Sequence, residues 1–389
     1  MNKKILVTAL LAPLAGMAHA QSSVTLYGLI DAGVSYVSNV RDNAGGSSHA
    51  FRYGDGVASG SRWGLRGTED LGGGLKVVFV LESGFNSGTG AMGQNNALFG
   101  RQAYVGLATS NAGTVSFGRQ YTFSSDILGS NYSTGANTAA GNYAWHVNDV
   151  DQLTSSRVSN AVKFTSDNFA GFTFGALYAF SNQAGAFAGA PAGASGAGSS
   201  RTWSFGANYA QGPFSIGAAY TDIRYPSQAS PTNFSTALAN ANAAAAGTIR
   251  ELRTYGIGGR YVFGPATLWA LWSNTLFSPV SGSSTAYQAY EVGGKYALTP
   301  ALYGGLGYTY SRASGSFGGH WNQVNGVIDY ALSKRTDVYL LGIYQRASGS
   351  VNGQDLQAQI GSSASSFFEP SGPGARSQVA TRVGIRHRF

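Results

Sequence analysis

The 389-residue sequence has no cysteine, little charge and, after its first 20 residues, no apolar run long enough for a membrane helix. The absence of cysteine excludes a disulfide framework and a thiolate metal site. Only 11% of the residues are charged, which is low for a soluble protein of this size. The five histidines are scattered without the spacing of a metal-ligating pair, so neither a metal nor a cofactor is expected.

Glycine, with 56 residues, and aromatic residues, at 13%, are abundant instead. The chain also begins with the features of a secretory signal peptide. Lys3 and Lys4 precede an apolar stretch from Ile5 to Leu14, and Ala18-His19-Ala20 fits a cleavage site. We therefore expect export, cleavage after Ala20 and a mature chain of residues 21–389 that forms one domain.

Alternation with period two recurs along the mature chain, as expected for strands with two unlike faces. In the last segment, Val383 and Ile385 share one face, whereas Arg382 and Arg386 lie on the other. The clearest such segments are residues 172–180, 214–221, 302–311 and 378–389.

Short turns and long loops alternate between these segments. Seven tight turns are predicted at 69–74, 110–113, 166–170, 210–213, 263–265, 298–300 and 333–336. Eight long loops are predicted near 37–60, 86–97, 122–156, 182–200, 224–249, 278–284, 314–320 and 348–376. Together they separate sixteen strands.

This layout predicts an all-β fold, a 16-stranded antiparallel transmembrane β-barrel with short periplasmic turns and long external loops. Closure is required because an open sheet edge in hydrocarbon would leave backbone groups unpaired. A barrel of this size encloses an aqueous channel, so the apolar faces must point outward. A soluble β-sandwich is the alternative, but it would show no systematic difference between its two sets of connections.

Aromatic residues near the predicted strand ends favour the membrane interpretation, because such rings sit at the headgroup level. Generic packing of aromatic residues in strands is the alternative for each single residue. The predicted girdle residues are Trp203, Tyr209, Tyr220, Tyr255, Tyr261, Tyr296, Tyr330, Tyr339 and Phe389.

Several motifs resemble those of Gram-negative trimeric general-diffusion porins, and the likeness covers the whole mature chain. They are Val24-Thr25-Leu26-Tyr27-Gly28, the stretch 60–67 followed by Glu69-Asp70-Leu71-Gly72, the stretch 100–107, Phe117-Gly118-Arg119-Gln120, Ser333-Lys334-Arg335-Thr336 and the terminal Phe389.

The resemblance implies a homotrimer in the outer membrane of a Gram-negative bacterium, in contact with its lipid and lipopolysaccharide. It also implies a third loop folded inward to narrow the pore. Phe389 would be the signal read by the outer-membrane assembly machinery. The implied function is a water-filled channel for passive diffusion of small hydrophilic solutes and ions, with no nucleic-acid partner.

The same resemblance places a basic wall of the pore constriction at Arg62, Arg101, Arg119 and Arg157. The alternation agrees for Arg62 and Arg157, whose same-face neighbours are polar. The same-face neighbours of Arg101 and Arg119 are apolar, so the assignment of these two to the lumen depends on the resemblance alone.

The loop at residues 122–156 holds Asp126, Asp149 and Asp151 but no Lys or Arg. A loop of this length in a compact fold is functional or marks a misassigned element. The arginines on adjoining strands give this loop a reason to fold inward. Its Asp126-Ile127-Leu128-Gly129 stretch stands where the family carries an acidic Pro-Glu-Phe-Gly-like turn. Asp126 is therefore the main candidate for the acidic wall, with Asp149 and Asp151 as its partners and Glu82 as a further lumen acid.

Other basic residues lie on polar strand faces and outnumber the acids Asp329 and Glu291 there. This excess predicts a modest anion preference. The predicted lumen charges are Arg66, Lys163, Arg260, Lys295, Arg382, Arg386 and Arg388.

Other function classes have less support. The Gly-rich stretch 88–93 matches a dinucleotide-binding pattern but opens no helix. A barrel-type hydrolase would need a nucleophile near a histidine, and His146, close to Asp149 and Asp151, is the only candidate. A non-conducting adhesin would have a smaller or plugged barrel. A substrate-selective channel stays an alternative to a general one. The loops at 184–200 and 235–248 have low complexity, and the alanines of the second also allow a helix.

Overall fold

The fold is described from a computed structural model for residues 23–154, 156–180, 201–224, 249–279, 282–315, 318–351, 354–362 and 371–389. The predicted signal peptide and the low-complexity loops at 184–200 and 235–248 lie outside the described residues. None of the helices in the described ranges is long and apolar enough to span a membrane.

Antiparallel strands form one continuous sheet, and its neighbouring strands are mostly neighbours in sequence. The strands are β1 (Ser23–Arg41), β2 (Ser47–Asp55), β3 (Arg62–Gly72), β4 (Leu75–Gly84), β5 (Gln102–Thr109), β6 (Gly113–Tyr121), β7 (Arg157–Ser166), β8 (Phe172–Ala179), β9 (Arg201–Gln211), β10 (Phe214–Arg224), β11 (Ile249–Phe263), β12 (Ala266–Pro279), β13 (Thr285–Ala297), β14 (Leu302–Gly315), β15 (Gly318–Ala331), β16 (Thr336–Val351), β17 (Gln354–Asp355) and β18 (Ser377–Arg388). A short α2 (Gly93–Asn96) lies between β4 and β5.

The sheet closes into a barrel because β1 pairs along one edge with β18, from Leu29 opposite Arg388 to Val37 opposite Ala380. Along its other edge, the first part of β1 pairs with β3 and the second part with β2. These two segments therefore occupy one place in the barrel, and β17 is only a two-residue extension beside β16. The predicted closed 16-stranded antiparallel barrel is confirmed.

The connections also follow the prediction at one end of the barrel. Each of the seven predicted tight turns joins two consecutive strands, from the β3–β4 turn to the β15–β16 turn. At the other end, the predicted loop at 37–60 is wrong in extent. The first strand continues to Arg41 and forms a hairpin with β2, so this end of the barrel carries additional sheet. The predicted loop at 314–320 is also too long, since β15 begins at Gly318.

Outward faces are apolar, as the alternation predicts. On β18, Val383 is 63% exposed, whereas the neighbouring Arg382 is 1% exposed. Most of the predicted girdle residues, such as Trp203, Tyr296 and Tyr330, are also exposed. Tyr339 was predicted among them and is wrong, because it is 3% exposed and points inward. Its hydroxyl donates to Asp31 Oδ1 at 2.6 Å and accepts from Arg382 Nε at 2.8 Å.

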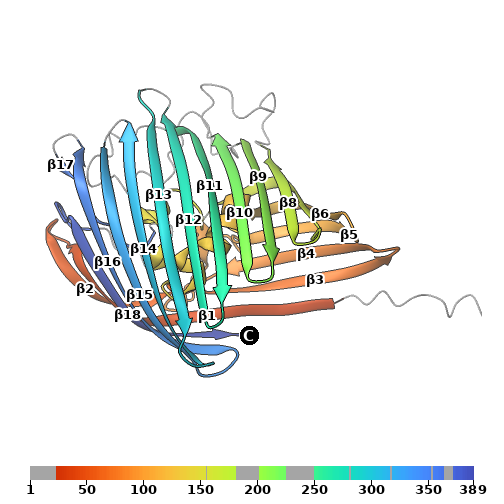
Figure 1. Cartoon of the computed structure of the whole chain (residues 1–389), viewed down its shortest axis with the longest axis horizontal. Coiled ribbons are helices and arrows are strands. Elements are labelled where there is room, and N and C mark those ends of the chain that lie inside the picture. Colours follow the sequence, from red (N-terminus) through yellow and green to blue (C-terminus); the bar gives the residue numbers. More distant parts are fainter. Residues whose placement is uncertain are drawn as a thin grey trace, which may run out of the picture.

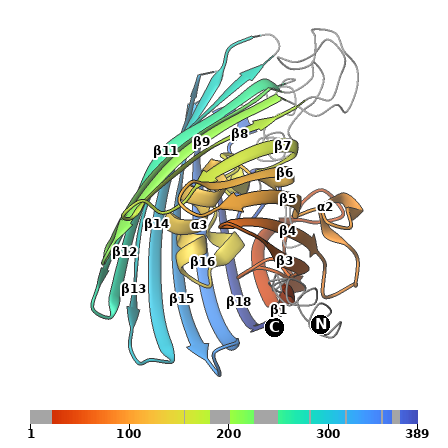
Figure 2. The same ribbon diagram turned by 90° about the vertical axis from the view of Figure 1, so that its right-hand side faces the viewer.

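Residues 122–154 and 156 lie inside the ring of strands, so the inward-folded third loop is confirmed. Figure 1 shows the helices of this segment behind the front strands, and Figure 2 shows α3 enclosed by strands of both walls. The segment consists of short helices: η2 (Ser124–Gly129), α3 (Ser130–Tyr132), α4 (Thr134–Asn137), η3 (Gly141–Ala144) and η4 (Val147–Asp149). The buried apolar clusters of the protein form where this loop meets the inner wall.

Candidate functional site

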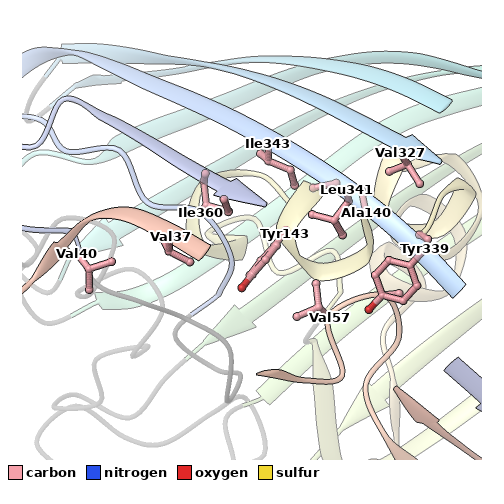
Figure 3. Packing of buried hydrophobic residues seen from close by; sticks show 14 residues of the cluster. Val37, Val40, Val57, Ala140, Tyr143, Val327, Tyr339, Leu341, Ile343 and Ile360 are labelled. Atoms are coloured by element: carbon pink, nitrogen blue, oxygen red, sulfur yellow. The ribbon is translucent and has the colours of Figure 1, made fainter. Parts of the chain in front are cut away.

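The third loop (residues 122–156) is held against the inner wall by apolar contacts. Ala140 and Tyr143 of the loop pack in one buried cluster with Val57, Leu341 and Ile343 (Figure 3). A second cluster places Ile127, Leu128 and Tyr132 against β7, β8, β10 and β12. These side chains exclude water from one side of the loop, which stabilises its inward position.

Glycine on the wall makes room for this packing. A Cβ atom at Gly258 on β11 would lie 2.5 Å from Cβ of Tyr132, so no larger residue fits without moving the loop. Tyr132 is fully buried, and its hydroxyl donates to Asn208 Oδ1 on β9. The glycine content of the inward faces is thus part of what seats the loop.

A buried polar cluster fixes the far end of the loop. His146 is 4% exposed, with Nδ1 2.5 Å from Asp151 Oδ2 and Nε2 2.8 Å from Glu291 Oε2 on β13. Ser273 on β12 donates to the same Asp151 oxygen at 2.8 Å, and Glu291 Oε1 accepts from the backbone N–H of Thr134. We call His146, Asp151 and Glu291 the loop anchor. It ties both halves of the loop to two neighbouring strands.

Beside the loop, the structure has a cavity of about 930 Å³. The four arginines that the resemblance assigns to the basic wall, Arg62, Arg101, Arg119 and Arg157, all line it. Asp126 of the third loop lines it as well. The structure therefore brings five of the predicted site residues together at the narrowed part of the barrel.

The positive charge of one of the four arginines, Arg101, is balanced by the carboxylate of Glu82. Arg101 Nε donates to Glu82 Oε1 at 2.6 Å, and its Nη2 donates to the Tyr121 hydroxyl at 2.9 Å. Glu82 also accepts from the Tyr27 hydroxyl at 3.0 Å, so this acid is 5% exposed behind the arginine. Glu82, predicted as a further lumen acid, balances Arg101 and is not among the residues that line the cavity.

The other three arginines carry no ion pair with any residue in the described ranges. Arg119 donates to the Gly100 carbonyl at 2.8 Å and to Ser159 Oγ at 2.8 Å, both of which are neutral. Arg157 Cζ lies 4.6 Å from the centroid of the Tyr121 ring, a cation–π contact. With Arg62, these residues leave three arginines without an ion pair around the cavity. Asp55 also lines it and accepts only from Ser61 and Ser87 among the described residues, so the net excess is two positive charges.

A β-bulge explains why Arg119 reaches the cavity although Val115 and Phe117, at the same parity, are exposed outside. The register between β6 and β7 shifts between Gly118 and Gln120, and the opposite Asn160 has φ of 56°. A bulge re-aims the neighbouring side chain. Arg101 escapes the alternation for a simpler reason, because it precedes β5 and is not part of the strand.

The three aspartates of the third loop do not all lie on the cavity wall, in contrast to the prediction. Asp126 borders the cavity, but it forms an ion pair with Lys163 on β7. Asp149 and Asp151 are each 1% exposed and lie outside the cavity lining. Asp151 belongs to the loop anchor, and Asp149 Oδ1 accepts from the backbone N–H of Thr154 at 3.3 Å. Placing these two acids on the cavity wall was wrong, because both carboxylates hold the loop in shape.

Comparisons with known proteins agree on one family. Residues 7–350 match the model of the Gram-negative porins. An outer membrane porin protein of Bordetella pertussis is 32% identical to this chain over 100% of both sequences. The chain belongs to the Gram-negative porin family. This porin is also 31% identical to outer membrane porin protein 32 of Delftia acidovorans over 100% of both.

Solved structures give the same result. The anion-selective porin from Comamonas acidovorans superposes with a TM-score of 0.72 at 26% identity, over 95% of this chain and 100% of that one. OmpT of Vibrio cholerae, at 15% identity and a TM-score of 0.66 over 95% and 98% of the two chains, shares the fold. The porin is therefore an outer-membrane channel for passive diffusion of small hydrophilic solutes and ions.

Several charges predicted to face the lumen of the porin are buried or paired. Arg382 is 1% exposed, with Nη2 2.9 Å from the Gly54 carbonyl and 3.6 Å from Asp31 Oδ1, so it is no lumen charge. Arg386 pairs with Asp337 at 2.9 Å and Asp329 at 3.6 Å, and Arg388 pairs with Asp337 at 2.8 Å. These contacts join β18 to β15 and β16 at the periplasmic end.

The other three predicted lumen charges differ in the groups that they contact. Lys295 donates to the Asn137 carbonyl of the third loop at 2.8 Å. Arg66 is exposed and lies over the Tyr27 ring at 5.2 Å. Arg260 is half-buried on the inward face of β11 and has no ion pair among the residues that the structure describes. None of the three lines the arginine-rich cavity.

Two features were not predicted from the sequence. Tyr121 contacts both Arg101 and Arg157 and so organises the basic wall. Its place, two residues after Arg119 at the end of a strand, is the signal that would have pointed to it. The loop anchor was also missed, because Glu291 is 145 residues away from His146 in sequence.

The surroundings of His146 do not fit the catalytic role that a barrel-type hydrolase would need. His146 is enclosed with a carboxylate on each ring nitrogen. A general base needs one nitrogen open toward a nucleophile. His146 therefore acts in holding the loop.

The loop anchor should respond to alkaline pH. Burial lowers the pKa of His146, but the Asp151 carboxylate and the hydrogen bond to Glu291 outweigh it and raise the pKa from 6.5 to about 10. A group with a raised pKa stabilises the folded state fully below its unfolded pKa and loses that contribution as pH rises through the folded value. Single-channel recordings should therefore show larger current fluctuations as the pH approaches 10. A His146→Asn variant should lack this change, and a wild type equally quiet at pH 7 and at about pH 10.5 would contradict it.

Proposed function

We propose that this porin prefers anions. The observation that carries the proposal is the charge balance of the cavity. Arg62, Arg119 and Arg157 face it without an acidic partner in the described residues, whereas Glu82 and Asp126 are each matched by a basic group and Asp55 offsets only one of the three arginine charges. Fixed positive charge beside a narrow aqueous path raises the local concentration of anions and lowers that of cations. The anion-selective porin from Comamonas acidovorans, similar in fold and 26% identical, supports the same conclusion.

We further infer a homotrimer, exported by cleavage after Ala20 and inserted through recognition of its C-terminal strand. The exposed apolar side chains of the early strands, including Val24, Leu26, Val105 and Phe117, support a subunit interface. Phe389 supports the assembly role, because it directly follows β18 and continues the pairing of that strand with β1. Its backbone exchanges two hydrogen bonds of 3.1 Å with Gly28.

Flux through reconstituted vesicles tests the ion preference. Sulfonate and quaternary ammonium probes of matched size have no neutral form that crosses lipid by itself. We expect the sulfonate to enter porin vesicles faster than the ammonium ion. Equal exclusion of both probes, with small sugars still passing, would indicate a channel selective for neutral solutes. Faster entry of the ammonium ion would contradict the proposal.

Asp126→Asn should increase the anion preference, because it leaves the Lys163 ammonium group without its acidic partner beside the cavity. Asp149→Asn removes an equal charge from the same loop but outside the cavity, so it serves as the matched control. The zero-current potential in a salt gradient should shift toward the anion limit for Asp126→Asn alone. An identical shift for both variants would mean that total loop charge matters and position does not.

A further inference from the structure

The eighth external loop turns into the barrel. Its segment 354–362 lies against β15, β16 and β18 on the inner wall, and we call it the inner eighth-loop segment. Each side chain from Leu356 to Ile360 is at most 4% exposed. Ser362, the last residue of the segment, lines the same cavity as the arginines. Two inward parts of the chain, this segment and the third loop, therefore border the cavity.

Apolar contacts join the two inward parts. Ile360 of the inner eighth-loop segment belongs to the buried cluster that contains Tyr143 of the third loop (Figure 3). Leu356 belongs to a second buried cluster, together with Val147 and Val150 of the third loop. Apolar contacts have no preferred direction, so they bring the two parts together without fixing their relative position. Hydrogen bonds are needed for that.

A row of three buried glutamines supplies hydrogen bonds to both parts. Gln345 on β16 is opposite Gln323 on β15 and also opposite Gln378 on β18, and each of the three is at most 3% exposed. The adjacent Val324 and Tyr344 are 48% and 43% exposed on the outside, so the glutamines point inward. We call these three residues the glutamine row. It crosses three neighbouring strands on the inner wall.

The β15 end of the glutamine row binds the third loop. Gln323 Nε2 donates to the carbonyls of Tyr143 and Trp145, at 3.3 and 3.4 Å. The same nitrogen donates to Asn325 Oδ1 at 3.1 Å, and Gln323 Oε1 accepts from Gln345 Nε2 at 2.7 Å. The amide of Gln323 is therefore held between the third loop on one side and Gln345 on the other.

The other two glutamines of the row bind the inner eighth-loop segment. Gln345 Oε1 accepts from the backbone N–H of Gln359 at 2.6 Å, and Gln378 Oε1 accepts from that of Ile360 at 2.8 Å. Gln345 thus uses its oxygen for the eighth loop and its nitrogen for Gln323. Within the described ranges, no hydrogen bond joins Gln345 directly to the third loop.

We propose that Gln345 is a positioning residue of the channel, which couples the inner eighth-loop segment to the third loop through Gln323. Because the glutamine row is buried, an amide that loses one partner leaves an unsatisfied polar group, which costs more than the bond itself contributes. A displacement of one part therefore weakens the bonds that hold the other. The two parts that border the cavity keep or lose their positions together. This inference does not depend on the ion preference of the pore.

Hydrogen exchange of the full-length porin in detergent, followed by mass spectrometry, tests the coupling. Gln345→Met keeps the size of the side chain and removes both of its polar atoms. We expect exchange at the backbone amides of Leu356 and Ala358, which bond to other backbone carbonyls, to rise by roughly tenfold, as for one lost buried hydrogen bond. Exchange at Tyr143 in the third loop should rise as well. This second response is decisive, because a purely local role of Gln345 would not produce it.

Two further variants and a control sharpen the test. Gln323→Met should raise exchange at Leu356, although no described hydrogen bond joins Gln323 to the inner eighth-loop segment. Combining it with Gln345→Met should add little, because both changes break the same row, whereas independent contacts would add. Gln288→Met is the matched control. Gln288 lies on the outward face of β13 with the exposed Tyr290, so both inward parts should stay unchanged.

Entry of a neutral trisaccharide into porin vesicles gives the functional readout. It should be faster for Gln345→Met than for the wild type or Gln288→Met, and it reports no ion preference, so failure of the anion proposal would appear separately. Exchange that rises only in the part that each variant contacts would overturn the proposal, as would unchanged exchange in both parts. If Gln345→Met forms no channels, Gln378→Met takes its place. It removes only the bond to Ile360 and should still speed exchange at Tyr143.

Discussion

Replacing Arg62, Arg119 and Arg157 with Gln should abolish most of the anion preference of the porin. These three guanidinium groups line the cavity without an ion pair to any described residue, so their loss removes the uncompensated charge. We expect the ratio of anion to cation permeability to fall by roughly tenfold, the low end of the effect of charged clefts on local ion concentration. The zero-current potential in a potassium chloride gradient measures this ratio.

The control for this variant removes the same number of positive charges elsewhere. Lys76 near the start of β4 is exposed, as are Lys334 and Arg335 in the β15–β16 turn, so replacing all three with Gln should leave the permeability ratio close to that of the wild type. If both triple variants shift the ratio equally, net charge and not cavity charge determines selectivity. Raising the salt concentration should reduce the wild-type preference, because the screening length shortens from about 10 Å at about 0.1 M to about 3 Å at about 1 M.

His146→Leu should release the third loop. The substitution leaves Asp151 and Glu291 as buried carboxylates without their shared cationic partner. Removing one member of a buried ion pair costs about 3–5 kcal/mol, a large part of the stability of a locally packed loop. We expect a larger and noisier single-channel conductance and faster cleavage of the loop by added protease, while the barrel itself remains folded.

Two comparisons make this prediction specific. His49 is exposed on β2, so His49→Leu should change neither conductance nor protease resistance. Adding Asp151→Asn and Glu291→Gln to His146→Leu should restore part of the loop stability, because neutral amides avoid the buried charges. A quiet channel of wild-type conductance in His146→Leu would show that the apolar contacts of Tyr132 and Tyr143 hold the loop without the anchor.

Local sequence patterns were sufficient for most of the barrel. Alternation depends only on the two-residue repeat of a strand, and turns such as 210–213 depend on nearby Gly and Pro, so both can be read directly. The pattern failed where the chain departs from regular strand geometry. The bulge beside Arg119 reverses the expected direction of a side chain, and the β1–β2 hairpin extends the sheet into a stretch predicted as a loop.

Pairing of charges could not be predicted because it depends on the folded path. Asp126, Asp149 and Asp151 look alike as acids of one loop, yet only Asp126 reaches the cavity. Asp151 turns away because His146 and Ser273 bind it, and Ser273 lies 122 residues later in the sequence. Tyr339 was wrongly predicted to face outward because its inward-facing partners are also distant in the sequence. Its burial follows from Asp31 and Arg382, which meet it only when the barrel closes.

The zero-current potential of the wild-type porin across a planar bilayer, with a tenfold gradient of potassium chloride, measures the proposed anion preference directly. Chloride diffuses faster than potassium through the channel if the unpaired arginines govern permeation. The potential should have the sign of a channel more permeable to chloride than to potassium, with a clear magnitude at low salt and a smaller one at high salt. A potential of the opposite sign, or none at any salt concentration, would contradict it.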